Sequence, residues 1–277
     1  MDTKLHFHIK AQPDDTTCGP TCLQAVYNYY DDKIALDKVI GQVKQLKGGG
    51  TLAVLMGCHA LRRGYRAKLY TYNLQVFDPT WFNLNGAEIQ NRLQRQIEVK
   101  SNPKVRAASK AYLEFLRLGG TIRFEDLSAQ LVRGLLSHGI PILTGLSATF
   151  LYHTAREVSV GRRMVYDDIN GEPTGHFVVL CGYDRETRTA LVADPLLPNP
   201  ISPTSIYPVR LNRLVCAIML GSLTYDANLL IITPKKSLQA RQAKMINQAT
   251  GQNVHRRTAP GEVFQPPVKR RIKRRRS

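Results

Sequence analysis

The sequence predicts an α+β fold in which a helical lobe precedes a lobe built from antiparallel strands. Two observations support this prediction. Apolar residues recur at helical spacing through much of residues 1–137, whereas residues 138–234 contain short apolar runs bounded by Gly, Pro and Asp. Helices followed by strands, without regular alternation, are typical of folds that segregate the two kinds of element.

A first helix is expected over residues 18–31. Leu23, Val26 and Tyr30 recur at the spacing of one helix face. Pro20 fits the first turn, because the backbone N–H that proline lacks would have no partner there. The pattern therefore predicts that the helix begins at Cys18.

The remaining elements of the first half follow from similar patterns, with Gly, Asn and Pro at their ends. They are a helix over 51–63, a strand over 65–72, a charged helical stretch over 85–118 interrupted at Asn102 and Pro103, and a helix over 124–137. The second half is predicted to hold buried strands over 140–144, 177–183, 189–193 and 229–233. The short link between 177–183 and 189–193 favours an antiparallel pair.

The positive charge is concentrated at the end of the chain. Of 39 Lys and Arg residues, 13 lie within 235–277, against the single acid Glu262, and the whole chain has a net charge of +18. Because large apolar residues are few there, we expect 235–277 to be a basic, disordered tail. The folded domain is predicted over 1–234, with the helical lobe over about 1–137 and the β-lobe over about 138–234.

The five cysteines are scattered and odd in number, which argues against a disulfide framework. The first residues lack the basic start and apolar run of a secretory signal. No stretch approaches the roughly 20 apolar residues needed to span a bilayer. We therefore expect a cytoplasmic protein with free thiols and no membrane span.

The segment from Gln12 to Val26 combines three features of an acyl-transfer site. Cys18 lies at a helix start, where unpaired N–H groups and the helix dipole favour a thiolate over a thiol. Gly19 permits close backbone approach beside the sulfur. The amide of Gln12, a short loop upstream, is a donor for an oxyanion formed on a carbonyl that Cys18 attacks, with the Cys18 N–H as second donor.

A thiolate nucleophile needs a base that is held in one orientation. His176 opens the predicted strand over 177–183, and Asp194 closes the strand over 189–193. If these strands pair through the turn between them, His176 and Asp194 lie at the same end. The pairing therefore predicts an imidazole–carboxylate pair.

Three separated motifs occur in an order that resembles a known family. They are Gln12 with Cys-Gly-Pro at Cys18, His176 before a Val-Val-Leu-x-Gly-Tyr strand, and Ala-Asp-Pro at Asp194. In this order they resemble the bacteriocin-processing, double-glycine-leader cysteine peptidases and their stand-alone relatives without transporter domains. The resemblance spans roughly 5–234 and implies a papain-like two-lobe fold with a cleft between the lobes. It also implies that Cys18 is the nucleophile, His176 the base, Asp194 the third member and Gln12 the oxyanion donor.

Several alternatives remain open at this point. The same triad serves either a hydrolase or a thioester-forming acyl transferase or peptide ligase, and an inactive scaffold that binds polyanions through its tail is a third reading. The alternative to Asp194 as the carboxylate of the triad is Asp184, and the alternatives to His176 as the base are His59, His138 and His153. No metal or cofactor is expected, since paired-ligand spacings are missing. The expected partner is a peptide or protein substrate, with sequence-blind contact between the tail and a polyanion such as nucleic acid.

Overall fold

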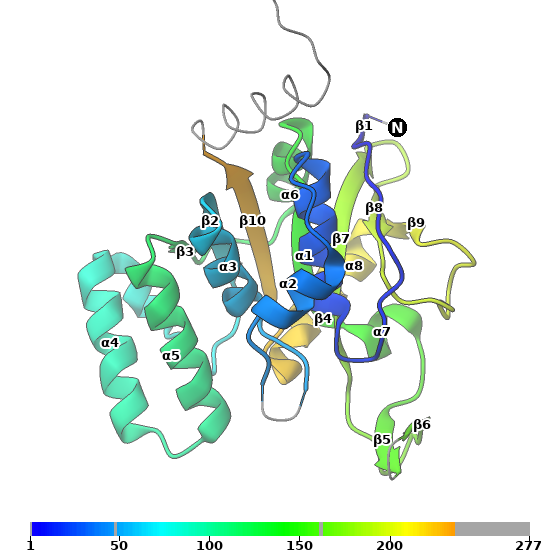
Figure 1. The fold of residues 1–277 in the computed structure, drawn as a ribbon. Coiled ribbons are helices and arrows are strands. Elements are labelled where there is room, and N and C mark those ends of the chain that lie inside the picture. Colours follow the sequence, from blue (N-terminus) through cyan, green and yellow to red (C-terminus); the bar gives the residue numbers. More distant parts are fainter. Residues whose placement is uncertain (1, 47–48, 161–162, 236–277) are drawn as a thin grey trace, which may run out of the picture.

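The computed structural model of the chain describes residues 2–46, 49–160 and 163–235. A mixed sheet forms its centre, with strand order β3-β2-β10-β4-β7-β8-β9 and with β1 paired to β7 (Figure 1). The strands of this sheet are β1 Thr3–Lys4, β2 Tyr65–Thr71, β3 Thr121–Arg123, β4 Ile142–Ser147, β7 Gly175–Asp184, β8 Thr189–Ala193, β9 Ile206–Arg210 and β10 Asn228–Pro234. Neighbouring strands are antiparallel except β2 and β3. This arrangement confirms the α+β prediction.

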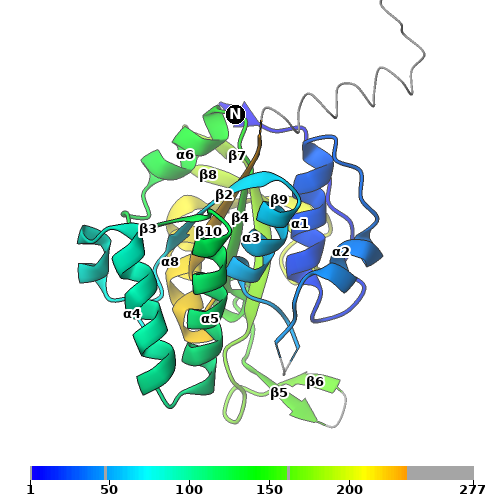
Figure 2. The ribbon, with the colours of Figure 1, turned by 60° about the vertical axis from the view of Figure 1, so that its left-hand side comes forward.

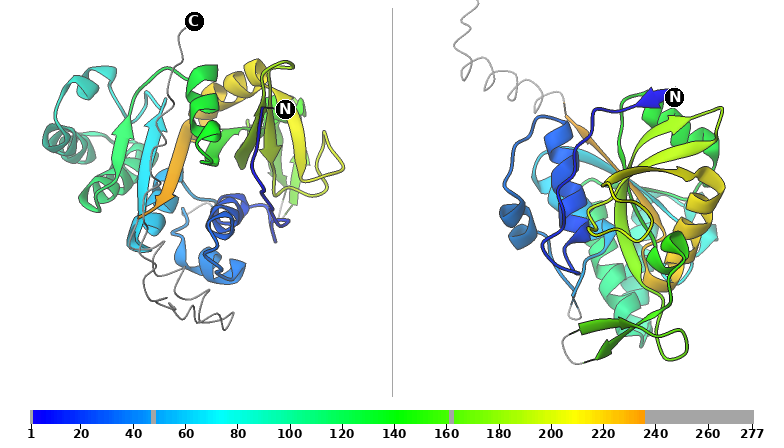
Figure 3. Two further views of the ribbon diagram at one scale, coloured as in Figure 1. Left: turned by 90° about the horizontal axis from the view of Figure 1, so that it is seen from above. Right: turned by 90° about the vertical axis from the view of Figure 1, so that its right-hand side faces the viewer.

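Helices cover both faces of the sheet. They are α1 Cys18–Tyr29, α2 Leu36–Gln42, α3 Ala53–Arg62, α4 Gly86–Val99, α5 Pro103–Arg117, α6 Ala129–Ser137, α7 Ala148–Tyr152 and α8 Leu211–Leu220. Helices α1 and α3 lie on one face and α8 lies on the opposite face (Figures 1 and 3). The branched residues of β4, β7 and β10 are buried between these layers, which explains why those strands read as continuous apolar runs.

Helices α4 and α5 form an antiparallel pair at the β3 end of the sheet (Figure 2). The break between them follows from the two residues that the sequence singles out. The side chain of Asn102 accepts hydrogen bonds from the backbone N–H groups of Lys104 and Val105, and Pro103 occupies the first turn of α5. The predicted interruption of the charged helical stretch is therefore confirmed.

The antiparallel pairing of β7 with β8 is also confirmed. In its register Val179 lies opposite Ala193, and β8 ends there, so Asp194 follows the strand directly. The register shifts between Leu180 and Gly182, which makes a bulge at Cys181. Strand β7 begins at Gly175, one residue before His176, and His176 pairs with Leu146 of β4.

Strand β10 joins the two halves of the chain. It pairs with β2 from Asn228 to Pro234 and with β4 from Asn228 to Leu230. Two strands from the first half, β2 and β3, therefore continue the sheet of the second half. The division of the chain near residue 137 stays a prediction.

The helix expected over 124–137 is too long by several residues. Strand β3 ends at Arg123, and α6 begins only at Ala129, after the side chain of Ser128 caps its N-terminus by accepting from the Leu131 N–H. The helices that the sequence analysis did not predict are α2, α7 and α8, and the strands are β1, β3, β9 and the separate hairpin of β5 Glu157–Val160 and β6 Arg163–Tyr166. The predicted tail, apart from Lys235, lies outside the described residues. Over the part of the chain that is described, every helix is too short or too polar to cross a bilayer.

Candidate active site

Cys18 is the first residue of α1, and 9% of the residue is exposed. Helix α1 approaches β7 closely at this point because Gly19 has no side chain. A Cβ at Gly19 would lie 2.8 Å from a Thr51 methyl, 3.1 Å from the Met56 sulfur and 3.2 Å from the Phe177 ring. The close approach expected at Gly19 is therefore present, and it places the start of α1 beside the residue that follows His176.

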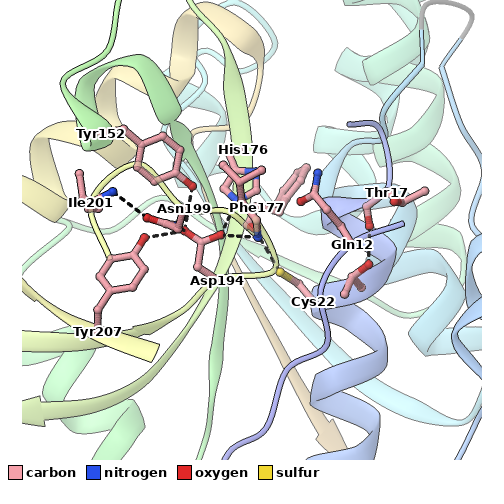
Figure 4. A network of polar contacts seen from close by, with 12 residues as sticks. Gln12, Thr17, Cys22, Tyr152, His176, Phe177, Asp194, Asn199, Ile201 and Tyr207 are labelled. Atoms are coloured by element: carbon pink, nitrogen blue, oxygen red, sulfur yellow. Dashed lines mark hydrogen bonds and ion pairs between the residues drawn. The ribbon is translucent and has the colours of Figure 1, made fainter. Parts of the chain in front are cut away.

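The imidazole of His176 lies between Cys18 and Asp194. Its Nε2 is 2.8 Å from Oδ1 of Asp194 (Figure 4). Cys18 is its second side-chain hydrogen-bond partner. Because Nε2 is engaged by the carboxylate, Nδ1 is the nitrogen left for the sulfur. The structure thus brings together three side chains that are far apart in the sequence.

The protonation of this cluster follows from its burial and its charges. Burial alone lowers the pKa of His176, but hydrogen bonds to Asp194 and Cys18, with the negative charges of both, outweigh burial and raise the pKa to about 10. Burial alone would raise the pKa of Asp194, but the hydrogen bond and positive charge of His176 hold it below its ordinary value. The site therefore favours an imidazolium beside an ionised carboxylate.

Three side chains that the sequence analysis missed hold Asp194 in place. Tyr152 and Asn199 donate to its Oδ2 at 2.8 and 2.9 Å, and Tyr207 donates to the same oxygen (Figure 4). The backbone N–H of Leu196 donates to Oδ1 at 2.9 Å. Burial and the negative charge of Asp194 raise the pKa of both tyrosines, so both remain donors. No local motif marks these two tyrosines among the 12 in the chain.

Gln12 lies on the segment that leads into α1. Its backbone N–H donates to the carbonyl of Pro195 at 2.8 Å, which ties it to the residue after Asp194. Its side-chain Nε2 donates to the carbonyl of Asp14 at 2.9 Å, while Oε1 is buried and makes no hydrogen bond with a described residue. The second hydrogen on Nε2 is left for another acceptor.

The rival residues lie elsewhere. Asp184 accepts from the N–H of Thr187 in the turn between β7 and β8. His59 contacts Tyr27 and Gln42, whereas His138 contacts the Gly134 carbonyl. His153 ends α7 in the left-handed conformation. Asp194 is thus the carboxylate against His176.

The other cysteines have surroundings that disfavour a thiolate, or lie outside this cluster. Cys22 donates to the Phe177 carbonyl at 3.2 Å, and burial with the nearby negative charges of Cys18 and Asp194 raises its pKa well above the ordinary value. Burial raises the pKa of Cys58 and of Cys181 to about 12. Cys216 is exposed on α8.

A second buried carboxyl group lies beside the strand that carries His176. A Cβ at Gly175 would collide with Oδ2 of Asp226 and would lie 2.7 Å from Oγ1 of Thr224. Burial raises the pKa of Asp226 to about 7, and the Thr224 hydroxyl opposes that shift. A glycine at 175 is thus required for β7 to start against these two side chains.

Three solved structures are similar to this chain at low identity. A double glycine motif protease from an AMS/PCAT transporter, in complex with the leader peptide, is 13% identical over 84% of this chain and 95% of that chain, with a TM-score of 0.41. The peptidase domain of Streptococcus ComA, a bifunctional ABC transporter involved in quorum sensing, is 13% identical over 83% and 100%, with a TM-score of 0.38. Xylellain, a cysteine protease from Xylella fastidiosa, is 14% identical over 84% and 86%, with a TM-score of 0.39. Among curated proteins, none matches the sequence.

The family comparison covers most of the described chain. Residues 4–202 match the Peptidase_C39 like family, and this range contains Gln12, Cys18, His176 and Asp194. The resemblance read from the three sequence motifs is thereby confirmed. The chain belongs to the Peptidase_C39 like family and is a cysteine peptidase.

Proposed function

We propose that Cys18, His176 and Asp194 form the catalytic triad of this peptidase and that Gln12 donates a hydrogen bond to the oxyanion. One observation carries the proposal. A buried imidazole is bonded through Nε2 to an ionised carboxylate and has, as its second side-chain partner, the cysteine at a helix N-terminus. This is the arrangement that an activated cysteine requires.

The first half of the reaction forms a thioester. The Cys18 thiolate attacks the carbonyl carbon of a peptide bond, and a C–S bond forms as the carbonyl oxygen gains negative charge. The Gln12 amide and the Cys18 backbone N–H stabilise that oxygen. The His176 imidazolium then gives its proton to the departing amine as the C–N bond breaks.

The second half releases the acyl group. Neutral His176 takes a proton from water, the water oxygen attacks the thioester, and the thiolate leaves. Asp194 keeps the imidazole in one orientation through both halves and favours its protonated form. The fixed position of Asp194, with its three side-chain donors and one backbone donor, supports this role. The substrate is a peptide or protein, and water is the acceptor.

The test is alkylation by iodoacetamide at pH 6, with each cysteine followed by mass spectrometry. Cys216 is exposed and serves as the internal reference thiol. Cys18 should react about 10–100-fold faster than Cys216 although it is less accessible, because a thiolate is the reactive form and an ordinary thiol is almost fully protonated at this pH.

His176→Ala should remove most of this advantage while Cys216 keeps its rate. Cys18→Ala should abolish peptide hydrolysis. If Cys18 reacts no faster than Cys216 in the unmodified protein, the assignment of Cys18 as nucleophile is wrong.

A further inference from the structure

A buried carboxyl group that takes no part in the proposed reaction lies at the start of β7. It belongs to Asp226, which is 7% exposed and lies just before β10. Its backbone N–H donates to the Gly221 carbonyl, and its own carbonyl accepts from the Asn228 N–H, both at 2.7 Å. The part of the chain that carries this carboxyl group is therefore fixed on both sides.

Asp226 packs against the backbone on both sides of His176. A Cβ on Gly175, the residue before His176, would collide with Oδ2 of Asp226. A Cβ on Gly145 would collide with the Asp226 carbonyl and would lie 2.7 Å from its Cβ. Gly145 in turn pairs with Phe177, the residue after His176. Because both contacts are made to glycines, the acid approaches the strand closely at the position of the base.

Few groups stabilise the negative charge of this carboxylate. Burial raises the pKa of Asp226 to about 7, and the Thr224 hydroxyl, its side-chain hydrogen-bond partner, opposes that shift together with the positive charge of His176. Tyr112 of α5 also feels the charge of Asp226, but burial raises the pKa of its hydroxyl, which stays neutral. By contrast, Asp194 has donors on both oxygens. The charge of Asp226 is thus weakly compensated where it stands.

We propose that Asp226 is a positioning residue of this peptidase, and that its charge keeps the catalytic proton on His176 without a hydrogen bond to the imidazole. The inference rests on the proposed function. Coupling between two titrating groups is reciprocal. Since the positive charge of His176 favours ionised Asp226, ionised Asp226 favours protonated His176 by the same free energy.

The two carboxylates act on the imidazole in different ways. Asp194 bonds Nε2 of His176 and fixes the orientation of the ring, whereas Asp226 contributes charge alone. The other groups that face the ring are Cys18, whose negative charge also favours the imidazolium, and Tyr152, whose hydroxyl stays neutral because burial raises its pKa. Buried surroundings screen charge weakly. Ionised Asp226 therefore extends to higher pH the range in which the leaving amine can take a proton from His176.

The test is the variant Asp226→Asn, which keeps the size of the side chain and removes its charge. The alkaline limb of the pH profile of kcat/KM should move to a pH roughly 0.5–1 lower, and the maximum should stay within about threefold, because Asp194 still holds the ring. Imidazole NMR, with the signals of His176 assigned from a His176→Ala variant, should show the same displacement of its titration. This second readout needs no turnover.

Thr224→Val is the matched control, because it removes the hydroxyl beside Asp226 and leaves an acid that is ionised in the alkaline range. It should keep the alkaline limb of the unmodified protein. Thermal unfolding shows whether Asp226 is the buried acid described. Because the fold raises its pKa from 3.8 to about 7, its contribution to the free energy of unfolding is complete below about pH 3.8 and is lost as the pH rises toward 7. Asp226→Asn should therefore gain more in Tm at pH 8 than at pH 4.

The outcomes separate this inference from the proposed function. An unchanged titration of His176 in Asp226→Asn would overturn it, and a change in thermal unfolding alone would make Asp226 a purely structural acid. An equal displacement in Thr224→Val would overturn it too, since packing and not charge would then be the cause. If Cys18 of the unmodified protein reacts with iodoacetamide no faster than Cys216, the proposed triad has failed, and the NMR titration still decides the role of Asp226.

Discussion

Asp194 has no exposed surface, and five donors bond its two carboxylate oxygens. A buried carboxylate without such partners would be protonated at neutral pH. Here the donors come from β7, α7, β9 and the loop after β8, so that four parts of the fold hold one side chain. The orientation of His176 is therefore determined by the fold as a whole.

The protonation of His176 has a consequence for pH. Because the fold raises the pKa of His176 from 6.5 to about 10, it favours the imidazolium. The corresponding contribution to the free energy of unfolding is complete below about pH 6.5 and is lost as the pH rises toward 10. The same proton is needed by the leaving amine, so kcat/KM should fall as the pH rises through about 10.

Replacing Asp194 should shift the alkaline limb of the pH profile of kcat/KM. Asp194→Asn removes the negative charge that helps to raise the pKa of His176, so the alkaline limb of kcat/KM should shift to lower pH and the maximum should fall on the order of 10²–10⁴-fold. The measurement is a pH profile of peptide hydrolysis. Asp184→Asn, in the β7–β8 turn, is the control and should keep the profile of the unmodified protein. The reverse behaviour of the two variants would contradict the assignment.

The role of Gln12 is separable from thiolate formation. Gln12→Ala should lower kcat by roughly 10²–10³-fold, because the oxyanion loses one donor. Labelling of Cys18 by iodoacetamide at pH 6 should persist, since that reaction forms no oxyanion. Both rates are measured on the same protein sample. Full turnover in Gln12→Ala would show that the backbone N–H of Cys18 stabilises the oxyanion without help from the Gln12 amide.

At the scale of elements, the sequence predicts the parts that carry His176 and Asp194. The runs that became β7 and β8 are apolar, rich in branched residues and joined by a short polar turn, so both their type and their antiparallel pairing follow from local pattern. Helix α8, which the sequence analysis did not predict, could also have been predicted from its pattern, since Leu211, Leu214 and Ile218 recur at helical spacing. No local sequence pattern predicts the role of Tyr152 or Tyr207, because that role comes from packing across the sheet.

The start of β7 allows a test of close packing. Gly175→Ala should lower the free energy of unfolding by about 1–3 kcal/mol, because the new methyl group displaces the side chains of Asp226 and Thr224. It should also slow the labelling of Cys18, since His176 is the next residue. Thermal unfolding and iodoacetamide rates provide the two measurements.

Gly134 is the matched control for this substitution. It lies within α6, and a Cβ there would meet nothing within 4 Å. Gly134→Ala should therefore stabilise the protein by about 0.5–1 kcal/mol through the helix preference of alanine. Equal stability of Gly175→Ala and the unmodified protein would mean that β7 can shift freely at this end.

At the scale of the whole molecule, the strong positive charge and the site are separate in the sequence. Residues Gln12 to Asp194 contain every residue of the proposed site, whereas 13 basic residues lie within 235–277. We propose that this basic stretch binds polyanions through charge alone and takes no part in hydrolysis.

The fold class follows from the sequence, but the order of the strands does not, because β10 pairs with strands remote from it in the chain.

A chain that ends at Pro234 tests this separation. It keeps all of β10 and should hydrolyse peptides at the rate of the full chain. The full chain should bind RNA with an affinity that falls steeply as salt is added, and the shortened chain should bind weakly at any salt concentration. Titrations of both against one RNA at two ionic strengths measure this. Equal affinity of the two chains would show that 235–277 contributes nothing.

The central position of β10 has a consequence for how the protein is made. A nascent chain exposes Cys18 early, but β2 and β4 cannot join one sheet until the ribosome has completed the strand between them. At roughly 5–20 residues per second, that interval is on the order of ten to forty seconds. Throughout that interval β2 and β3 have no link to the rest of the sheet, because β10 is the strand that joins β2 to β4.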